Sequence, residues 1–267
     1  MFEHGTGHHA SINGLSMYYE VHGTRRPLVM LHGALSTIDT DFGKVLPEVA
    51  RTRQVIAIEQ QGHGHTADID RQLSYAQMAE DTAALLRHLR IEQADFFGYS
   101  VGGGVALQIA IRHPELVRKL VFAGGTSYNP DGLYPKVLEG IADIKPDALD
   151  GSPFQQAYAR VAPNPENWPR LIAKIIEMDL AYKGWSAETI QSVKAPVLLM
   201  IGDSDLVRPE HTVQMFRLLG GGVVGDIAAM TRSQLAILPG TSHITVMHRT
   251  DWLLSMVNEF LDAPVAA

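Results

Sequence analysis

The stretch GYSVG, Gly98–Gly102, decides how the rest of the chain is interpreted. One serine lies between two glycines, and a third glycine follows at Gly103. The segment is either a turn of small residues between a strand and a helix, or a strained turn that presents Ser100 as a nucleophile and needs glycine neighbours. G-x-S-x-G arises by chance in about one chain in ten of this composition, so the remaining sequence has to distinguish the two.

The composition excludes several classes of protein. The 267 residues could form one large α/β domain or two small ones, and 46% hydrophobic with 19% charged residues is typical of a globular protein. The net charge of −7, with no basic stripe, argues against nucleic acid as a partner. The absence of cysteine excludes disulfide frameworks, cysteine nucleophiles and thiolate metal sites.

The chain shows no sign of membrane insertion or of a metal centre. Its first residues lack a basic start followed by an apolar run, and no stretch of 18 apolar residues occurs. We therefore expect no signal peptide, no contact with a membrane and a cytoplasmic location. His63 and His65 lie in a glycine-rich turn without nearby carboxylates, so they are predicted as turn residues and no metal is expected.

Short apolar runs alternate with segments of helical periodicity. An Asn13-Gly14 turn predicts a hairpin that leads into a strand at Leu15–Val21. Later strands are predicted at Pro27–Gly33, Gln54–Glu59, Asp95–Gly98, Lys119–Ala123, Pro196–Gly202 and Leu235–Leu238. Helices are predicted at Tyr75–Leu89, Val101–His113, Glu210–Leu219 and Asp251–Leu261. This alternation indicates the α/β class, with a mostly parallel sheet and helices on both faces.

The alternation is interrupted after Gly125. Residues 126–194 contain no clear strand, many prolines and helical pieces such as Leu171–Met178. We predict a core domain formed by residues 1–125 and 195–267, with residues 126–194 inserted as a helical cap. Glycines 220, 222 and 225 fit a dinucleotide fingerprint, but they follow a predicted helix instead of a strand, so they are interpreted as a flexible loop.

Partners for Ser100 occur at later strand ends. A serine hydroxyl needs a base, and a histidine base needs a carboxylate that sets its tautomer and stabilises the imidazolium. Asp203 and Asp205 follow one predicted strand, and His243 follows the last one. The order Ser, Asp, His, with each residue at the end of a strand, favours a nucleophilic site over three unrelated turn residues.

These motifs resemble the α/β-hydrolase family over Leu15–Leu261. The resemblance is carried by HGA (32–34), EQQGHGHT (59–66), GYSVGG (98–103), GDSDLVRPE (202–210) and LPGTSH (238–243). It is similar to the small, cofactor-free branch that contains esterases, lactonases and haloperoxidase-like enzymes. The chain departs from the family's D-x-R-G-H-G-x-S pattern at Glu59 and Gln61, which usually shape the fold beside the site, and its loop 220–234 is longer than in compact members.

The resemblance implies roles for individual residues. Asp205, the second aspartate of its motif, would be the triad acid, and Asp203 a loop residue. The backbone N–H groups of Val101 and Ala34 would form the oxyanion hole, with Leu35 as an alternative donor, and His32 would be structural.

We expect a serine hydrolase that cleaves a carboxylic ester or lactone through an acyl-enzyme, without a metal or organic cofactor. Enzymes of this fold with aspartate at the elbow, such as dehalogenases and epoxide hydrolases, are disfavoured by Ser100. Carbon–carbon bond hydrolysis and perhydrolase activity stay open, as does a catalytically silent ligand-binding member. A Rossmann oxidoreductase is disfavoured because HGALST is not a glycine fingerprint. The sequence makes no prediction of oligomeric state.

Aromatic residues are candidates for the wall of an apolar substrate pocket. The candidates are Phe42, Tyr128, Tyr134, Phe154, Tyr158 and Trp168. The alternative for each is that it only packs the cap against the core.

Overall fold

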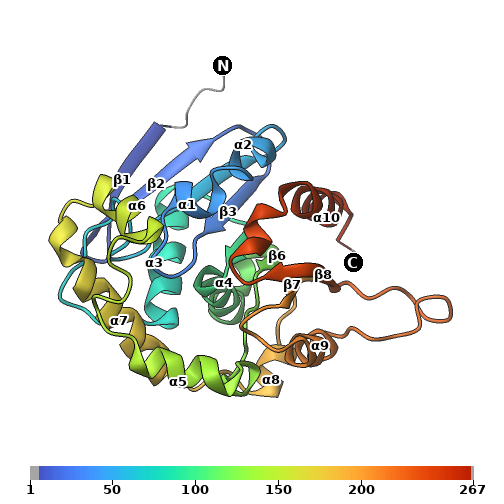
Figure 1. Cartoon of the computed structure of the whole chain (residues 1–267). Coiled ribbons are helices and arrows are strands. Elements are labelled where there is room, and N and C mark those ends of the chain that lie inside the picture. Colours follow the sequence, from blue (N-terminus) through green and yellow to red (C-terminus); the bar gives the residue numbers. More distant parts are fainter. Residues whose placement is uncertain (1–5, 266–267) are drawn as a thin grey trace.

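The computed structural model describes residues 6–265 and is organised around one eight-stranded sheet (Figure 1). The strands are β1 (Thr6–Ile12), β2 (Leu15–His22), β3 (Pro27–Leu31), β4 (Gln54–Ile58), β5 (Ala94–Tyr99), β6 (Val117–Ala123), β7 (Val197–Ser204) and β8 (Gln234–Ser242). Their spatial order is β1-β2-β4-β3-β5-β6-β7-β8. Strands β3 to β8 run parallel to one another, whereas β1 pairs antiparallel with β2 and β2 pairs antiparallel with β4, so the predicted mostly parallel sheet is confirmed.

The antiparallel edge is made by the predicted hairpin. Ile12 pairs with Leu15 across Asn13 and Gly14, whose φ angles are 48° and 87°. Two consecutive positive φ angles are what a tight turn between twisted strands requires, and Asn-Gly is the favoured pair there. Strand β2 then pairs with β4 and joins the hairpin to the parallel strands.

Strand β8 is longer than its predicted range. The expectation placed its end at Leu238, before Pro239 and Gly240, but the strand continues to Ser242. A register irregularity between Gly202 and Ser204 of β7 accommodates the extra residues. Proline is tolerated here because β8 is the last strand of the sheet, where an N–H is not needed for a further neighbour.

Helices cover both faces of the sheet. The core helices are α1 (Ile38–Phe42), α2 (Leu46–Val49), α3 (Tyr75–His88), α4 (Val101–Arg112), α9 (Pro209–Leu218) and α10 (Thr250–Asp262), with short 3-10 turns at Pro114–Leu116 and Thr245–His248. Buried residues of α3, α4 and α9 share one hydrophobic cluster, and those of α1, α2 and α10 share the other. Neighbouring residues of β5 divide between them: Phe96 belongs to the first cluster and Phe97 to the second.

All helices between β6 and β7 lie in the segment predicted as a cap. They are α5 (Pro135–Asp143), α6 (Pro153–Val161), α7 (Trp168–Ala181) and α8 (Ala187–Gln191), with 3-10 turns at Pro130–Gly132 and Pro165–Asn167. Helix α7 buries one apolar side, whereas no residue of α5 is buried. The division into core and cap domains stays a prediction. In the described range, 6–265, no helix combines the length and apolar character needed to cross a membrane.

Candidate active site

Ser100 occupies a sharp turn between β5 and α4. Its φ of 53° and ψ of −118° lie outside the helical and extended regions, a strained backbone for a residue with a side chain. A Cβ atom at Gly98 would overlap the carbonyl of Gly102, and one at Gly102 would overlap the carbonyl oxygen of Leu31 in β3. The glycines therefore let the start of α4 approach the sheet so closely that Ser100 is presented at the carboxyl edge of β5.

Three predicted residues meet at this edge. His243 Nε2 lies 2.8 Å from Ser100 Oγ, and His243 Nδ1 lies 2.8 Å from Asp205 Oδ1. Ser100 is half-buried, and the Asp205 carboxylate is fully buried. This continuous chain from hydroxyl to imidazole to carboxylate is the arrangement that activates a serine.

The surroundings of Asp205 favour its charged form. Burial is the largest single influence on its pKa and opposes ionisation, whereas the hydrogen bond and the charge of His243 favour it. The backbone N–H groups of Val207 (3.2 Å) and Gly125 (3.1 Å) also donate to the carboxylate. Together these partners hold the pKa of Asp205 below its ordinary value.

Asp203 has a different environment. Its carboxylate accepts the N–H groups of Gly240 (2.9 Å) and Thr241 (3.1 Å), and these bonds lower its pKa. Asp203 thus ties the end of β7 to the end of β8, just before His243. The imidazole of His243 instead hydrogen-bonds through Nδ1 to the carboxylate of Asp205, which accepts the bond. The role of Asp205 as the triad acid stays a prediction.

Tyr99 contacts His243 through both its hydroxyl and its ring. Its hydroxyl donates to the carbonyl of His243 (3.1 Å), and the two ring centroids are 5.5 Å apart. The sequence analysis did not single out Tyr99. Its place next to Ser100 was the available signal, because a residue beside the nucleophile is close to the other triad members.

The two predicted oxyanion donors lie at adjacent strand ends. Val101 is the first residue of α4, whose first N–H groups have no partner within the helix. Ala34 follows β3, which pairs with β5 up to Leu31 and Gly98. The N–H of Gly33 is already donated to Asp41 Oδ2 (2.7 Å), which leaves Ala34 as the next donor in the chain. The oxyanion role of both groups stays a prediction.

Asp41, which the sequence analysis missed, is a buried carboxyl near the triad. Burial raises its pKa to about 7, although the N–H of Gly33, the Ser36 side chain and the charge of His243 oppose this shift. The available signal was an acid next to Phe42 and three residues after Ile38 in the short helix α1. Asp41 fixes the turn that carries Ala34.

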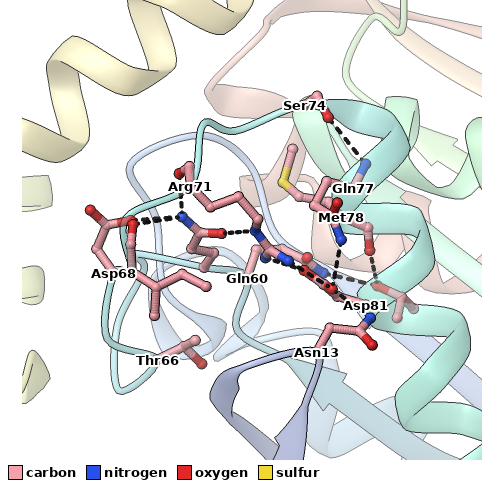
Figure 2. A network of polar contacts seen from close by, with 12 residues as sticks. Asn13, Gln60, Thr66, Asp68, Arg71, Ser74, Gln77, Met78 and Asp81 are labelled. Atoms are coloured by element: carbon pink, nitrogen blue, oxygen red, sulfur yellow. Dashed lines mark hydrogen bonds and ion pairs between the residues drawn. The ribbon is translucent and has the colours of Figure 1, made fainter.

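Glu59 and Gln61, the two residues that differ from the family's pattern, lie within a polar network beside the site. Glu59 accepts the N–H groups of His65 (2.6 Å) and Ile38 (3.3 Å). Gln61 accepts a hydrogen bond from Arg71 Nε (2.8 Å), and Arg71 continues to Asp81, an ion pair that Figure 2 shows. An arginine ten residues later in the chain thus contacts the glutamine that stands where the family has arginine.

The two histidines of this turn have separate environments. His63 is buried, and burial together with nearby His32 lowers its pKa to about 3, so its ring is neutral. His65 contacts the Glu59 carboxylate through Nδ1 at 2.9 Å, so the expectation that no carboxylate lies near this turn is wrong. Among residues 6–265, no three His, Cys, Asp or Glu side chains are grouped so that they could hold a metal ion.

The structure places four of the predicted pocket residues, namely Phe42, Tyr128, Tyr158 and Trp168, in packed surroundings, whereas Tyr134 is 41% exposed. Phe42 is fully buried, and its ring lies 5.7 Å from that of Phe97. Tyr128 stacks on His211 at 4.3 Å, and Tyr158 lies 5.3 Å from Trp168. Packing accounts for Phe42 in particular; contact of the three cap residues with a substrate stays a prediction.

The fold agrees with a family comparison. A family model described as alpha/beta hydrolase fold matches residues 26–167, more than half of the chain. The chain belongs to the alpha/beta hydrolase fold family. The predicted family and fold are therefore confirmed, and the chain is a member of a family of hydrolases.

This alpha/beta hydrolase is similar to proteins of several activities. It is 27% identical to a 2-hydroxymuconate semialdehyde hydrolase of Pseudomonas sp. strain CF600, over 92% of this chain and 90% of that one. It is 26% identical to a non-heme haloperoxidase of Rhodococcus erythropolis, over 86% and 90% of the two chains. A solved serine hydrolase involved in carbazole degradation superposes with a TM-score of 0.76 at 21% identity, covering 96% of this chain and 98% of that one.

Proposed function

We propose that this protein is a serine hydrolase that cleaves a carboxylic ester or lactone through an acyl-enzyme. The observation that carries the proposal is the hydrogen-bonded chain from Ser100 through His243 to Asp205, with 2.8 Å at each step. Serine with a histidine base suits acyl transfer, in which a hydroxyl attacks a carbonyl carbon.

Acylation begins when Ser100 Oγ bonds to the carbonyl carbon and passes its proton to His243 Nε2. The carbonyl electron pair moves onto oxygen, and the N–H groups of Ala34 and Val101 stabilise this oxyanion. One such donor is typically worth about 2.7–4 kcal/mol. The bond to the alcohol oxygen then breaks, and His243 returns the proton to the leaving alcohol.

Deacylation repeats these steps with water. His243 takes a proton from water as the water oxygen bonds to the acyl carbon. The bond between this carbon and Ser100 Oγ then breaks, and His243 returns the proton to Oγ, which releases the acid and restores Ser100. Asp205 stays ionised throughout and stabilises the imidazolium. Every proton is carried by a residue of the chain, so the proposed reaction needs only water as a co-reactant.

The substrate is proposed to be a small, moderately apolar molecule. Pocket walls are usually apolar with few polar groups. The predicted cap, residues 126–194, contains aromatic side chains that could form such a wall. Tyr128, Tyr158 and Trp168 are the residues we propose to border it.

The test is labelling with a fluorophosphonate probe, measured as intact-protein mass on the wild type and on Ser100→Ala. We expect one adduct on the wild type and none on the variant, with ester hydrolysis lost in parallel and the circular dichroism spectrum unchanged. Labelling of both proteins would reject Ser100 as the nucleophile. If the folded wild type forms no adduct with this probe or with a smaller phosphonate, the result would favour a binding protein that has lost catalysis.

Carbon–carbon bond hydrolysis is the second candidate. It is favoured by the 27% identity to a 2-hydroxymuconate semialdehyde hydrolase over 92% of this chain. A panel of esters and lactones of different acyl length, assayed beside 2-hydroxymuconate semialdehyde, separates the two. We expect kcat/KM to be higher for an ester or lactone; a preference for the semialdehyde that Ser100→Ala abolishes would assign the site to carbon–carbon cleavage.

A further inference from the structure

The outer side of β8 carries an apolar groove far along the sheet from β1. Strand β8 is the last in the sheet order, so its outer edge has no neighbouring strand among residues 6–265. Ile237 and Pro239 of β8 and Trp252 and Met256 of α10 line a groove of about 370 Å³. Ile237 is 42% exposed and Trp252 is 46% exposed, so large apolar side chains are left open to water beside an unpaired strand edge.

A second uncovered apolar segment precedes β8. We call residues 220–233 the arm; it connects α9 to β8 and projects away from the rest of the molecule (Figure 1). Ile227 is 87% exposed and Met230 is 80% exposed, and Val223 and Val224 are each at least half exposed. A protruding segment with four solvent-exposed apolar side chains has the shape and the chemistry to fill an apolar groove.

The charges identify a partner that fits both features. The chain has a net charge of −7, so two copies repel each other on average. The groove is lined by uncharged residues, and the arm contains one acid, Asp226, and one base, Arg232. A second copy can therefore approach here without like-charge repulsion and bury apolar side chains of both chains.

The position of the arm explains why it serves a partner instead of its own groove. The arm joins β8 at Gln234, the beginning of the strand. Trp252 lies near the other end, because Arg249 donates to the carbonyl of Gly240 (2.7 Å) and its guanidinium lies 5.2 Å from the Trp252 ring. Two β8 strands related by a two-fold axis run antiparallel, so the beginning of one lies beside the end of the other.

We propose that the protein is a two-fold dimer in which the β8 edges adjoin and the arm of each copy covers the apolar groove of the other. Ile227 and Met230 of one chain pack against Ile237 and Trp252 of its partner. The contact is isologous, so each interaction occurs twice and closes the assembly at two chains.

The first test is mass in solution by light scattering after size exclusion. We expect the wild type at twice the chain mass of 29.2 kDa. Ile227→Lys in the arm and Ile237→Lys in the groove should each weaken the dimer by about tenfold or more, because each places a charge in a buried apolar contact. Leu180→Lys is the matched control: Leu180 is 53% exposed on α7, outside both features, and should leave the dimer intact. A monomeric wild type, or a dimer that neither variant weakens, would overturn the proposal.

The second test locates the contact and uses the absence of cysteine in the chain. Ile227→Cys and Trp252→Cys proteins are mixed under mild oxidation and resolved by mass on a non-reducing gel. A disulfide between one chain of each kind supports the proposal, with Leu180→Cys mixed with Trp252→Cys as the control that should not cross-link. If the double variant Ile227→Cys/Trp252→Cys closes a disulfide within one chain instead, the arm covers its own groove and the dimer is rejected.

Discussion

The carboxyl edge of the sheet and the helices between β6 and β7 are held in place by different means. At the edge, backbone meets backbone: α4 approaches so closely that a side chain at Gly102 would overlap β3. In the helical segment, α7 is attached by side chains: its buried apolar residues join the hydrophobic cluster of α3 and α4, and Lys174 Nζ lies 2.8 Å from both carboxylate oxygens of Asp68. Helix α5, with no buried residue, has few attachments of either kind.

This difference separates the two tasks that an enzyme of this kind has. Close backbone contacts define positions to a fraction of an ångström, which a nucleophile and its base require. Side-chain attachments can change one at a time without disturbing the sheet. The geometry of the proposed triad therefore depends on the core, and substrate choice is expected to depend on the segment between β6 and β7.

The largest effect is expected at the triad acid. Asp205→Asn should lower kcat by about 10⁴-fold, because the histidine loses the acceptor that sets its tautomer. Asp203→Asn should cost at most about tenfold in kcat, because it disturbs only the junction of β7 and β8. Steady-state hydrolysis of the best ester from the panel measures both, and the reverse ranking would move the acid to Asp203.

The free energy of unfolding should fall strongly when a side chain is added where the backbone of α4 contacts the backbone of β3. Gly102→Ala should lower the free energy of unfolding by about 3 kcal/mol, because the new methyl group has to displace the chain at Leu31. Gly140→Ala in α5 is the control: no atom lies within 4 Å of the added methyl, and alanine is the better helix former, so stability should rise by about 0.5–1 kcal/mol. Urea unfolding measures both, and equal effects would remove the distinction between the two regions.

The polar attachment of α7 should be weaker than the backbone contact. Lys174→Met removes the ammonium from Asp68 and from the carbonyls of Ile69 and Arg71, and should cost about 2 kcal/mol. Lys136→Met on the exposed surface of α5 should change stability by less than about 0.5 kcal/mol. Thermal unfolding compares the two variants. If Lys136→Met costs as much as Lys174→Met, the attachment at Asp68 does not distinguish α7 from α5.

The smallest expected effect is a change in the pH dependence of the unfolding free energy at the contact between His211 and Tyr128, where the two regions meet. His211 of α9 accepts the N–H of Tyr128 (3.3 Å), and burial lowers its pKa to about 4, with the charge of Arg208 acting in the same direction. Between pH 6.5 and 4 the unfolded chain therefore binds more protons at this site than the folded one, so stability falls as the pH falls. His211 should contribute about 1–2 kcal/mol of this loss.

His211→Gln keeps an acceptor without the titration and should flatten the unfolding free energy against pH over that window. His88→Gln, on the exposed end of α3, is the matched control. An unchanged slope in His211→Gln would mean that the acid sensitivity arises elsewhere.

The sequence was most informative where signals are local. Strand and helix patterns come from periodic burial of neighbouring residues, and the Asn13-Gly14 turn follows from backbone preference, so these elements could be predicted from short windows. Ser100, Asp205 and His243 could be nominated because each follows a strand, and parallel strands end at one edge. The end of β8 was misplaced because its continuation past Pro239 depends on pairing with a distant strand.

Contacts between distant segments were decided only by the tertiary structure. Sequence order cannot show that Asp203 binds the β8 backbone while Asp205 binds His243, because two aspartates differ only in the groups that surround them in the folded chain. It also cannot show that Arg71 contacts Gln61. The same holds for Asp41, whose pKa is set by burial, and for Phe42, which packs into the core. The sequence by itself determined the class of fold and the chemical groups available for catalysis; their partners and protonation depend on long-range packing, which no local pattern encodes.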